Sequence, residues 1–408
     1  MHILLLSDYE SQSGGAAISA SRLAEAFTDS GQQTTRLVSY PDGKKHRWET
    51  ISLSPSFLAW MGLRKLPRSF AKPYANREAV RKLAHLLKGL KPDVINVHNV
   101  HGALSNGWSA ELLIICQEFA PVIWTLHDMW SFTGRCAFSF ECEKYLTGCD
   151  ETCPTPYEYP CLPSREISKA WQDRMYFFQK SSRLAAVTPS AWLAEKARAG
   201  LWQGLRVERI PYSLPLEVYA PVEKKVARQA LGLDVRSPVL LMAGVNLAER
   251  RKGVGIAIEA IKKTRQRPLT LLTLGSDPPP INLPDVWVQH LGFIDHERTK
   301  ALVFNAADLF IHPALADNLP NTVIESIACG TPVIAFDVGG LLELVHPGKT
   351  GWLAPGSDAE SFAQAIDIAL EEIAAGTGLR DTCRQVAKDE FSSELQGRRY
   401  LELIRQIG

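Results

Sequence analysis

The sequence contains no uninterrupted apolar run close to the roughly 20 residues that a membrane-spanning helix needs. Its first residues, Met1 to Asp8, have neither a basic segment nor a small-residue cleavage site, so they lack the pattern of a signal peptide. Charge of one sign is not in excess either, because 45 Lys and Arg balance 44 Asp and Glu, which argues against bulk binding of nucleic acid. We expect a cytoplasmic protein that does not bind nucleic acid.

The chain of 408 residues is 46% hydrophobic, which is enough for two separate cores. Short runs rich in Val, Ile and Leu alternate with helix-length segments, a pattern typical of parallel βαβ units. The predicted strands of the first set are 3–7, 34–38, 93–97, 122–126, 184–188 and 207–210. Those of the second set are 239–243, 269–274, 286–289, 309–312, 333–336 and 352–354. Each set indicates one Rossmann-like parallel sheet.

Segment 211–216 contains two prolines and has no periodicity, so it is predicted to join two domains, 1–210 and 211–390. Ligands of open parallel sheets bind beyond the carboxyl ends of the strands. Two such sheets facing across a cleft provide two half-sites, which suits an enzyme with two substrates.

The most informative stretch runs from Asp317 to Ile334, DNLPNTVIESIACGTPVI, which follows a predicted strand and opens a predicted helix. It closely resembles glycosyltransferase family 4, which carries two acidic residues before an Ala-Cys-Gly-Thr-Pro-Val-Ile run. Asp317 and Glu325 occupy these two positions, the first with Asp where the family usually has Glu. The resemblance implies the α/β fold called GT-B, with two Rossmann-like domains and a final helix, about 391–408, that packs back on the N-terminal domain.

The resemblance also implies how the second domain binds a nucleotide-sugar donor. The helix start at Asn321 and Thr322 binds the diphosphate, since N–H groups and the helix dipole favour anions there. Glu325 accepts the ribose hydroxyls, and Asp317 contacts the sugar or the charge that develops at its anomeric carbon. Without the matched run around them, the two acids would be an ordinary helix cap and a solvated charge.

A basic loop, from Gly244 to Gly253, resembles the family's Gly-Arg…Lys-Gly loop. Lys252 matches the family's lysine, whereas the arginine beside the first glycine is absent, and Arg251 or Arg250 has to replace it. The alternative for such a loop is a solvated helix entrance. The remaining donor-binding candidates follow other strand ends and are Gly15, Gly275 and Phe293, of which Phe293 could equally belong to the core.

Two predicted strands of the first set end in histidine motifs, His98 with His101 and His127 with Asp128. By resemblance, His127 contacts the donor sugar, and Asp128, His98 or His101 orients or deprotonates the acceptor hydroxyl. A lone histidine is more often structural, but the position at a strand end favours a functional role for His127.

Five cysteines fall in one stretch after the His-Asp motif, and a subgroup of family 4 has a similar Cys-rich insertion. Four of them could hold a structural zinc ion, namely Cys136, Cys142, Cys149 and Cys153. No pair has the tight C-x2-C spacing, so free thiols or a disulfide are equal alternatives.

The apolar segment 57–63 precedes a basic run and could lie on an anionic membrane surface, the alternative being a packed and solvated pair of helices. As a whole, the sequence predicts a retaining glycosyltransferase of the hexosyltransferase type (EC 2.4) that needs no catalytic cofactor. It would move a sugar from a UDP- or GDP-sugar to a glycan or lipid-linked acceptor in envelope or exopolysaccharide synthesis. The alternatives are a non-hydrolysing sugar-nucleotide epimerase and a non-catalytic sugar-nucleotide-binding protein.

Overall fold

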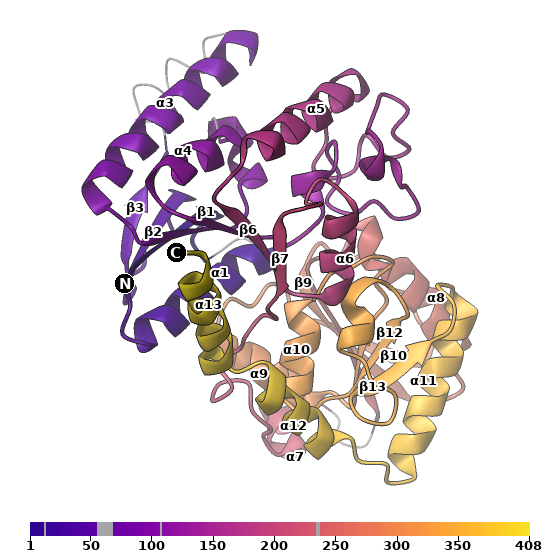
Figure 1. The fold of residues 1–408 in the computed structure, drawn as a ribbon. Helices are drawn as coiled ribbons and strands as arrows, with labels where there is room; N and C mark the ends of the chain where they lie inside the picture. Colours follow the sequence, from indigo (N-terminus) through magenta and orange to yellow (C-terminus); the bar gives the residue numbers. More distant parts are fainter. Residues whose placement is uncertain (12–13, 55–67, 107, 234–236) are drawn as a thin grey trace. The chain divides into compact units, whose positions relative to one another are not determined.

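The protein is described by a computed structural model over residues 1–11, 14–54, 68–106, 108–233 and 237–408 (Figure 1). The chain forms two compact units. Unit 1 comprises Met1–Pro211 and Ser393–Gly408, and unit 2 comprises Tyr212–Ser392. The segment 57–63, considered above for membrane contact, lies outside the described residues. Within the described ranges, no helix combines the length and apolarity needed to cross a membrane.

Unit 1 is built on a seven-stranded parallel sheet in the order β3-β2-β1-β4-β5-β6-β7. Its strands are β1 (His2–Tyr9), β2 (Gln33–Tyr40), β3 (Glu49–Ser52), β4 (Val94–Val97), β5 (Val122–Thr125), β6 (Leu184–Thr188) and β7 (Arg206–Arg209). The six strands predicted from the sequence are confirmed, but the sheet has one more. Strand β3 was not predicted, because its four residues are mostly polar and none is fully buried at this edge of the sheet.

Helices cover both faces of this sheet, as the alternating side chains of β1 show. Leu4 and Leu6 belong to one core with residues of α3, α4 and α6, whereas Ile3 and Leu5 belong to another with residues of α1 and α13. The helices of unit 1 are α1 (Gly14–Asp29), α3 (Arg68–Leu90), η1 (His101–Asn106), α4 (Glu111–Phe119), η2 (Trp130–Phe132), η3 (Lys144–Leu146), α5 (Ser164–Lys180), α6 (Ala191–Ala199) and α13 (Ser393–Ile407).

The C-terminal helix α13 belongs to unit 1, where it lies beside α1 (Figure 1). Tyr400 of α13 stands edge-on to Phe27 of α1, with ring centroids 5.9 Å apart. Its hydroxyl shares a buried hydrogen bond of 2.9 Å with Thr125 of β5. The last turns of the chain are thus tied to the sheet that its first residues begin.

Unit 2 contains a six-stranded parallel sheet in the order β10-β9-β8-β11-β12-β13, and all six strands predicted for it are confirmed. The strands are β8 (Val239–Asn246), β9 (Leu269–Ser276), β10 (Val286–His290), β11 (Leu309–His312), β12 (Val333–Phe336) and β13 (Gly351–Ala354). The helices are α7 (Lys224–Ala230), η4 (Arg250–Lys252), α8 (Val254–Lys263), α9 (Glu297–Ala306), α10 (Asn321–Ala328), η5 (Gly339–Glu343), α11 (Ala359–Ala374) and α12 (Arg380–Glu390).

Candidate active site

In unit 2, the loops after β8 and β11 bring two cations onto one carboxylate. Lys252 of η4 places its Nζ atom 2.8 Å from Oδ2 of Asp317. A guanidinium nitrogen of Arg251 lies 3.3 Å from the same oxygen and donates a hydrogen bond of 2.9 Å to the Ala316 carbonyl. Of the two arginines that could replace the family's missing one, Arg251 is thus the residue that joins Lys252 at Asp317.

The charge state of this cluster follows from its burial and its pairs. Burial of Asp317 favours the neutral acid, but Lys252 and Arg251 outweigh it and hold the pKa of Asp317 well below its usual range. His312 of β11 lies 3.3 Å from the same carboxylate oxygen, and burial lowers the pKa of this imidazole. Asp317 is therefore an ionised carboxylate. Lys252 and Arg251 could bind an incoming anion only if that anion shared the two cations with Asp317.

Helix α10 begins four residues after Asp317, at Asn321. Pro320 takes the N-cap position and makes no side-chain cap, so the first N–H groups of α10, on Asn321 and Thr322, point along the helix axis out of its start. Such an end favours an anion. Glu325 lies one turn further into the helix and is buried.

Two glycines let the backbone segments around these cations approach one another closely. Gly253 has φ +65, and a Cβ atom there would lie 1.9 Å from the carbonyl oxygen of Pro313. Gly275 has φ +143, and a Cβ atom there would lie 1.9 Å from the carbonyl oxygen of Gly244. The predicted donor positions Gly244 and Gly275 are therefore backbone neighbours. Phe293 follows β10 and is 55% exposed, so it does not belong to the core.

In unit 1, the strand-end histidines form a buried hydrogen-bonded chain. The Asn96 amide donates to the Ile123 carbonyl, so its oxygen faces His98 and accepts from Nε2 at 2.9 Å. Nδ1 of His98 then accepts at 3.0 Å from Nε2 of His127. Burial lowers the pKa of His127 to about 4 and that of His98 well below its usual range. Both rings are neutral near pH 7, and Asn96 sets their tautomers.

A second pair lies at the same strand ends, where His101 Nε2 is 3.0 Å from Oδ2 of Asp128. The other carboxylate oxygen of Asp128 accepts from the Trp130 backbone N–H at 2.8 Å. Burial favours the neutral acid, but His101 and these hydrogen bonds outweigh it and lower the pKa of Asp128. His98, His101, His127 and Asp128 together line a cavity of about 10 Å³, which has room for roughly one water molecule.

Two residues that were not predicted from the sequence also lie beside these histidines. Asp8, near the carboxyl end of β1, is buried, and it accepts hydrogen bonds from the backbone N–H groups of Tyr9 and Gly102. Burial raises the pKa of Asp8 to about 6. Tyr159, in the loop before α5, shares a hydrogen bond of 3.1 Å with Nδ1 of His101. The strand-end rule that pointed to His98 would have found Asp8, whereas no local pattern marks Tyr159.

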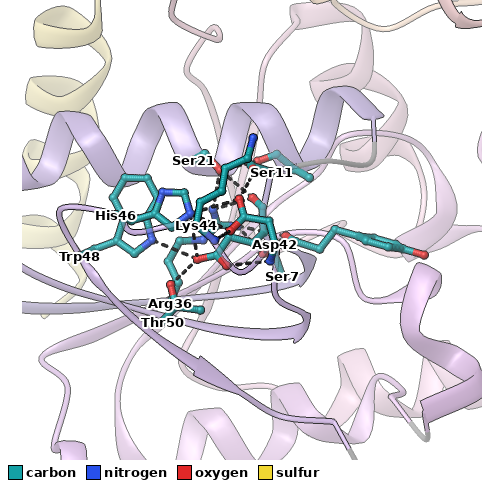
Figure 2. Close-up of polar contacts among 12 residues, drawn as sticks. Ser7, Ser11, Ser21, Arg36, Asp42, Lys44, His46, Trp48 and Thr50 are labelled. Atoms are coloured by element: carbon teal, nitrogen blue, oxygen red, sulfur yellow. Dashed lines mark hydrogen bonds and ion pairs between the residues drawn. The ribbon is translucent and has the colours of Figure 1, made fainter. Parts of the chain in front are cut away.

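A further polar cluster lies just beyond the ends of β1 and β2 (Figure 2). Glu10, Asp42 and His46 offer metal-ligand atoms within 4.8 Å of one another. His46 Nε2 lies 3.0 Å from Asp42 and 3.6 Å from Glu10, and the imidazole stacks on Trp48 at 4.6 Å. Glu10 also accepts hydrogen bonds from the side chains of Trp48 and Thr50. The polar groups of the cluster are hydrogen-bonded to one another. They hold the chain shortly before α1, whose first turn contains Gly15.

The structural zinc predicted on the cysteines is not supported. All five thiols of this stretch lie in described residues and are free, and no three of them lie within 4.8 Å of one another. Protein groups hold the loop instead. Arg135 donates to the Pro160 carbonyl at 2.8 Å, and the Gly134 N–H donates to Cys149 at 3.1 Å. The Arg174 guanidinium stacks 4.1 Å from the Trp130 ring.

Comparisons with known proteins agree with this geometry. Residues 13–211 match the domain described as Glycosyltransferase Family 4, and residues 237–372 match the domain described as Glycosyl transferases group 1. The two matched ranges contain the histidine motifs and the cluster around Asp317, respectively. The chain therefore contains a Glycosyltransferase Family 4 domain and a Glycosyl transferases group 1 domain.

Individual relatives agree with these domains. One relative is WcaC of Escherichia coli (strain K12), whose name describes a glycosyl transferase of colanic acid biosynthesis. It is 23% identical to this protein over 87% of this chain and 84% of the WcaC chain. Sucrose-phosphate synthase of Thermosynechococcus elongatus has a TM-score of 0.75 and 24% identity over 100% of this chain and 98% of its own. Anabaena HepE, solved with UDP-glucose, has a TM-score of 0.69 and 17% identity over 100% of both chains. These likenesses establish the GT-B fold.

Proposed function

We propose that the enzyme transfers a hexose from a UDP- or GDP-sugar to a glycan or lipid-linked acceptor, with retention of configuration at the anomeric carbon. The observation that carries the proposal is the pair of cations, Lys252 and Arg251, on one buried carboxylate four residues before the start of α10. Cations and a helix N-terminus are the groups that a departing diphosphate requires. The UDP-glucose bound by HepE makes UDP-sugars the first donors to test.

The proposed chemistry uses side-chain cations where other transferases use a divalent ion. Lys252 and Arg251 stabilise the negative charge of the leaving diphosphate, together with the first N–H groups of α10. Asp317 is engaged by both cations and is therefore a weak nucleophile, which favours a front-face route through an oxocarbenium-like state. In this route the acceptor oxygen bonds to the anomeric carbon on the face that the diphosphate leaves. A phosphate oxygen takes the acceptor's proton.

The acceptor side is assigned to unit 1. His127 contacts the donor sugar as a neutral imidazole, and Asp128 with His101 orients the acceptor hydroxyl. The relative named for colanic acid biosynthesis supports a polysaccharide of the cell envelope as the product. We place the reaction in the cytoplasm, at the inner face of the membrane if the acceptor is lipid-linked; flotation with anionic vesicles would test that contact.

The purified enzyme is incubated with UDP-, GDP- and ADP-sugars in EDTA, and nucleoside diphosphate release is measured with and without a bacterial glycan and lipid extract. Release from one donor that depends on the extract supports the transferase, and NMR of the product gives the anomeric configuration. Conversion of the donor to its epimer without extract identifies an epimerase. Tight nucleotide binding without any turnover identifies a binding protein.

A further inference from the structure

A surface groove of about 670 Å³ lies in unit 2, away from the residues considered so far. Its lining comes from three neighbouring strand starts: Ser237 precedes β8, Leu269 begins β9 and Val286 begins β10. Because the strands are parallel, their starts share one edge of the sheet, whereas Lys252 and Asp317 follow strand ends at the opposite edge. The 8 residues of β8 separate the two edges by roughly 23 Å. The groove is therefore distinct from the candidate active site.

One tryptophan gives the groove an exposed aromatic surface. Trp287 lies in β10, the edge strand of the sheet, where it pairs with Thr270 of β9. Its side chain is 49% exposed, and Pro268 and Leu269 lie in the same lining. Single exposed apolar side chains are ordinary on a protein surface, but this one lines a hollow of the size that small ligands occupy. An indole in such a place provides a flat apolar surface for a ring.

The groove also contains a hydroxyl proton without an acceptor. Ser237 and Thr270 both line the groove and are buried. Their hydroxyl oxygens lie 2.9 Å apart, so one hydroxyl donates to the other. Two hydroxyl protons and one hydrogen bond leave one proton that meets no acceptor in the described parts of the chain. A buried donor of this kind favours a ligand oxygen in the groove.

Two side chains of opposite charge complete the described lining. Arg267 is held in place, because it donates to the Thr264 hydroxyl at 2.8 Å and to the Ile261 carbonyl at 2.7 Å. Asp285 is exposed, and its φ of +59 is a backbone conformation that Asp tolerates better than most residues. The carboxylate of Asp285 makes no hydrogen bond with a described residue, so it can accept from a ligand. The groove thus presents donors and acceptors around an aromatic ring.

We propose that this groove is a non-catalytic site that binds sugar residues of a glycan chain. A pyranose has an apolar face, which packs on the indole of Trp287, and a rim of hydroxyls that both donate and accept. One hydroxyl donates to Asp285, and another accepts from the Ser237–Thr270 pair. That the chain is the enzyme's own acceptor or product rests on the proposed function. A polymer held at the groove stays at high effective concentration, so Trp287 should affect long acceptors and not single sugars.

The test uses the full-length enzyme without nucleotide sugar, in native gels cast with dextran, laminarin, an α-mannan or a galactomannan. We expect retardation in at least one gel. Trp287→Ala should weaken binding to that glycan roughly tenfold, and Trp287→Phe, which keeps a smaller ring, roughly threefold. Asp285→Asn, which suits the same backbone conformation, should weaken it roughly threefold. Ile368→Ala is the matched control, because Ile368 on α11 is 48% exposed outside the groove and should leave retardation unchanged.

The outcomes distinguish this site from the proposed function. No retardation in any gel, or equal retardation of Trp287→Ala and the wild type, overturns the inference. A nucleobase can also stack on an indole, so a Trp287→Ala variant that loses affinity for UDP or GDP instead of glycan overturns it as well. If glycan retardation depends on Trp287 but no nucleotide sugar is cleaved, only the proposed function fails.

An active donor allows the identity of the chain to be tested. Trp287→Ala should then raise the KM for a polymeric acceptor roughly tenfold and leave donor hydrolysis and the KM for a methyl hexopyranoside unchanged. Equal thermal unfolding of the variant and the wild type shows that the change is local. An unchanged KM for the polymer would overturn the assignment of the bound chain as the acceptor.

Discussion

Lys252 and Asp317, 65 residues apart in the chain, meet with Nζ 2.8 Å from Oδ2 at the carboxyl ends of two neighbouring strands. The lysine is held in the short η4 helix, and the carboxylate lies in the loop before α10. The pair therefore fixes a cation beside a helix start before any anionic ligand arrives. Such preorganisation avoids reorganisation when charge develops on a leaving group.

Replacing Lys252 by Ala should lower kcat/KM for the nucleotide sugar by about 10²–10³, because one cation at the leaving diphosphate is lost. Asp317 keeps Arg251 and His312, so the protein should remain folded and lose about 1–3 kcal/mol of unfolding free energy. Steady-state kinetics and urea unfolding measure the two effects. Lys262→Ala removes a lysine from an exposed ion pair on α8 and should change neither by more than about 0.5 kcal/mol. Equal kinetics in the two variants would refute the assignment.

The sequence allowed the candidate site in unit 2 to be predicted more fully than the candidate site in unit 1. The run from Asp317 to Glu325 is local, so its strand, loop and helix could be inferred from spacing, and the structure adds that Arg251 joins Lys252 there. Tyr159 reaches His101 from 58 residues away through a loop without periodicity, and only the folded chain shows this contact.

The strands of the two sheets show the same difference: some are determined by their own residues, and others by contacts with residues distant in the chain. The buried strand β12 is a continuous apolar run, and β4 is interrupted only by Asn96; both were predicted, because helices cover both of their faces. Strand β3 is polar and lies at an edge, where pairing with β2 decides its conformation. The predicted zinc site is not supported, because no three of the five thiols of this stretch lie within 4.8 Å of one another, whereas the ligands of a structural zinc ion converge on one point.

Gly253→Ala should destabilise unit 2 by about 2 kcal/mol or more, because φ is +65 and the added Cβ would lie 1.9 Å from the Pro313 carbonyl. Relief of that clash would also shift Lys252, so donor KM should rise. Gly255→Ala, two residues further in α8, meets open space and should stabilise the protein by about 0.5–1 kcal/mol. Thermal unfolding of both variants distinguishes a backbone requirement from a general effect of adding a methyl group. Similar shifts in both would contradict the argument.

Protonation of His127 should make the folded protein less stable at low pH. Burial lowers its pKa from 6.5 to about 4, so the unfolded chain binds its proton first. The stability that this neutral ring contributes is complete above about pH 6.5 and is lost as the pH falls toward 4, to an extent of about 1–3 kcal/mol. Urea unfolding of the wild type and His127→Asn at several pH values should show a difference that shrinks across this window. A constant difference would contradict the neutral assignment.

The titration of Asp8 should change the stability of the protein in the opposite direction to that of His127. Burial raises its pKa from 3.8 to about 6, so the folded protein holds the proton more tightly than the unfolded chain, and stability falls as the pH rises from about 4 to 6. Asp8→Asn removes this titration but gives the Tyr9 and Gly102 N–H groups only one oxygen to share, so it should be less stable than the wild type at pH 4. Between pH 4 and 7.5 the variant should gain about 1–3 kcal/mol relative to the wild type.

Because His127 and Asp8 titrate in overlapping windows with opposite signs, their contributions partly cancel in the wild type, and only the single variants expose them. A difference between Asp8→Asn and the wild type that does not change with pH would mean that Asp8 titrates near its ordinary value, as an acid in contact with water does.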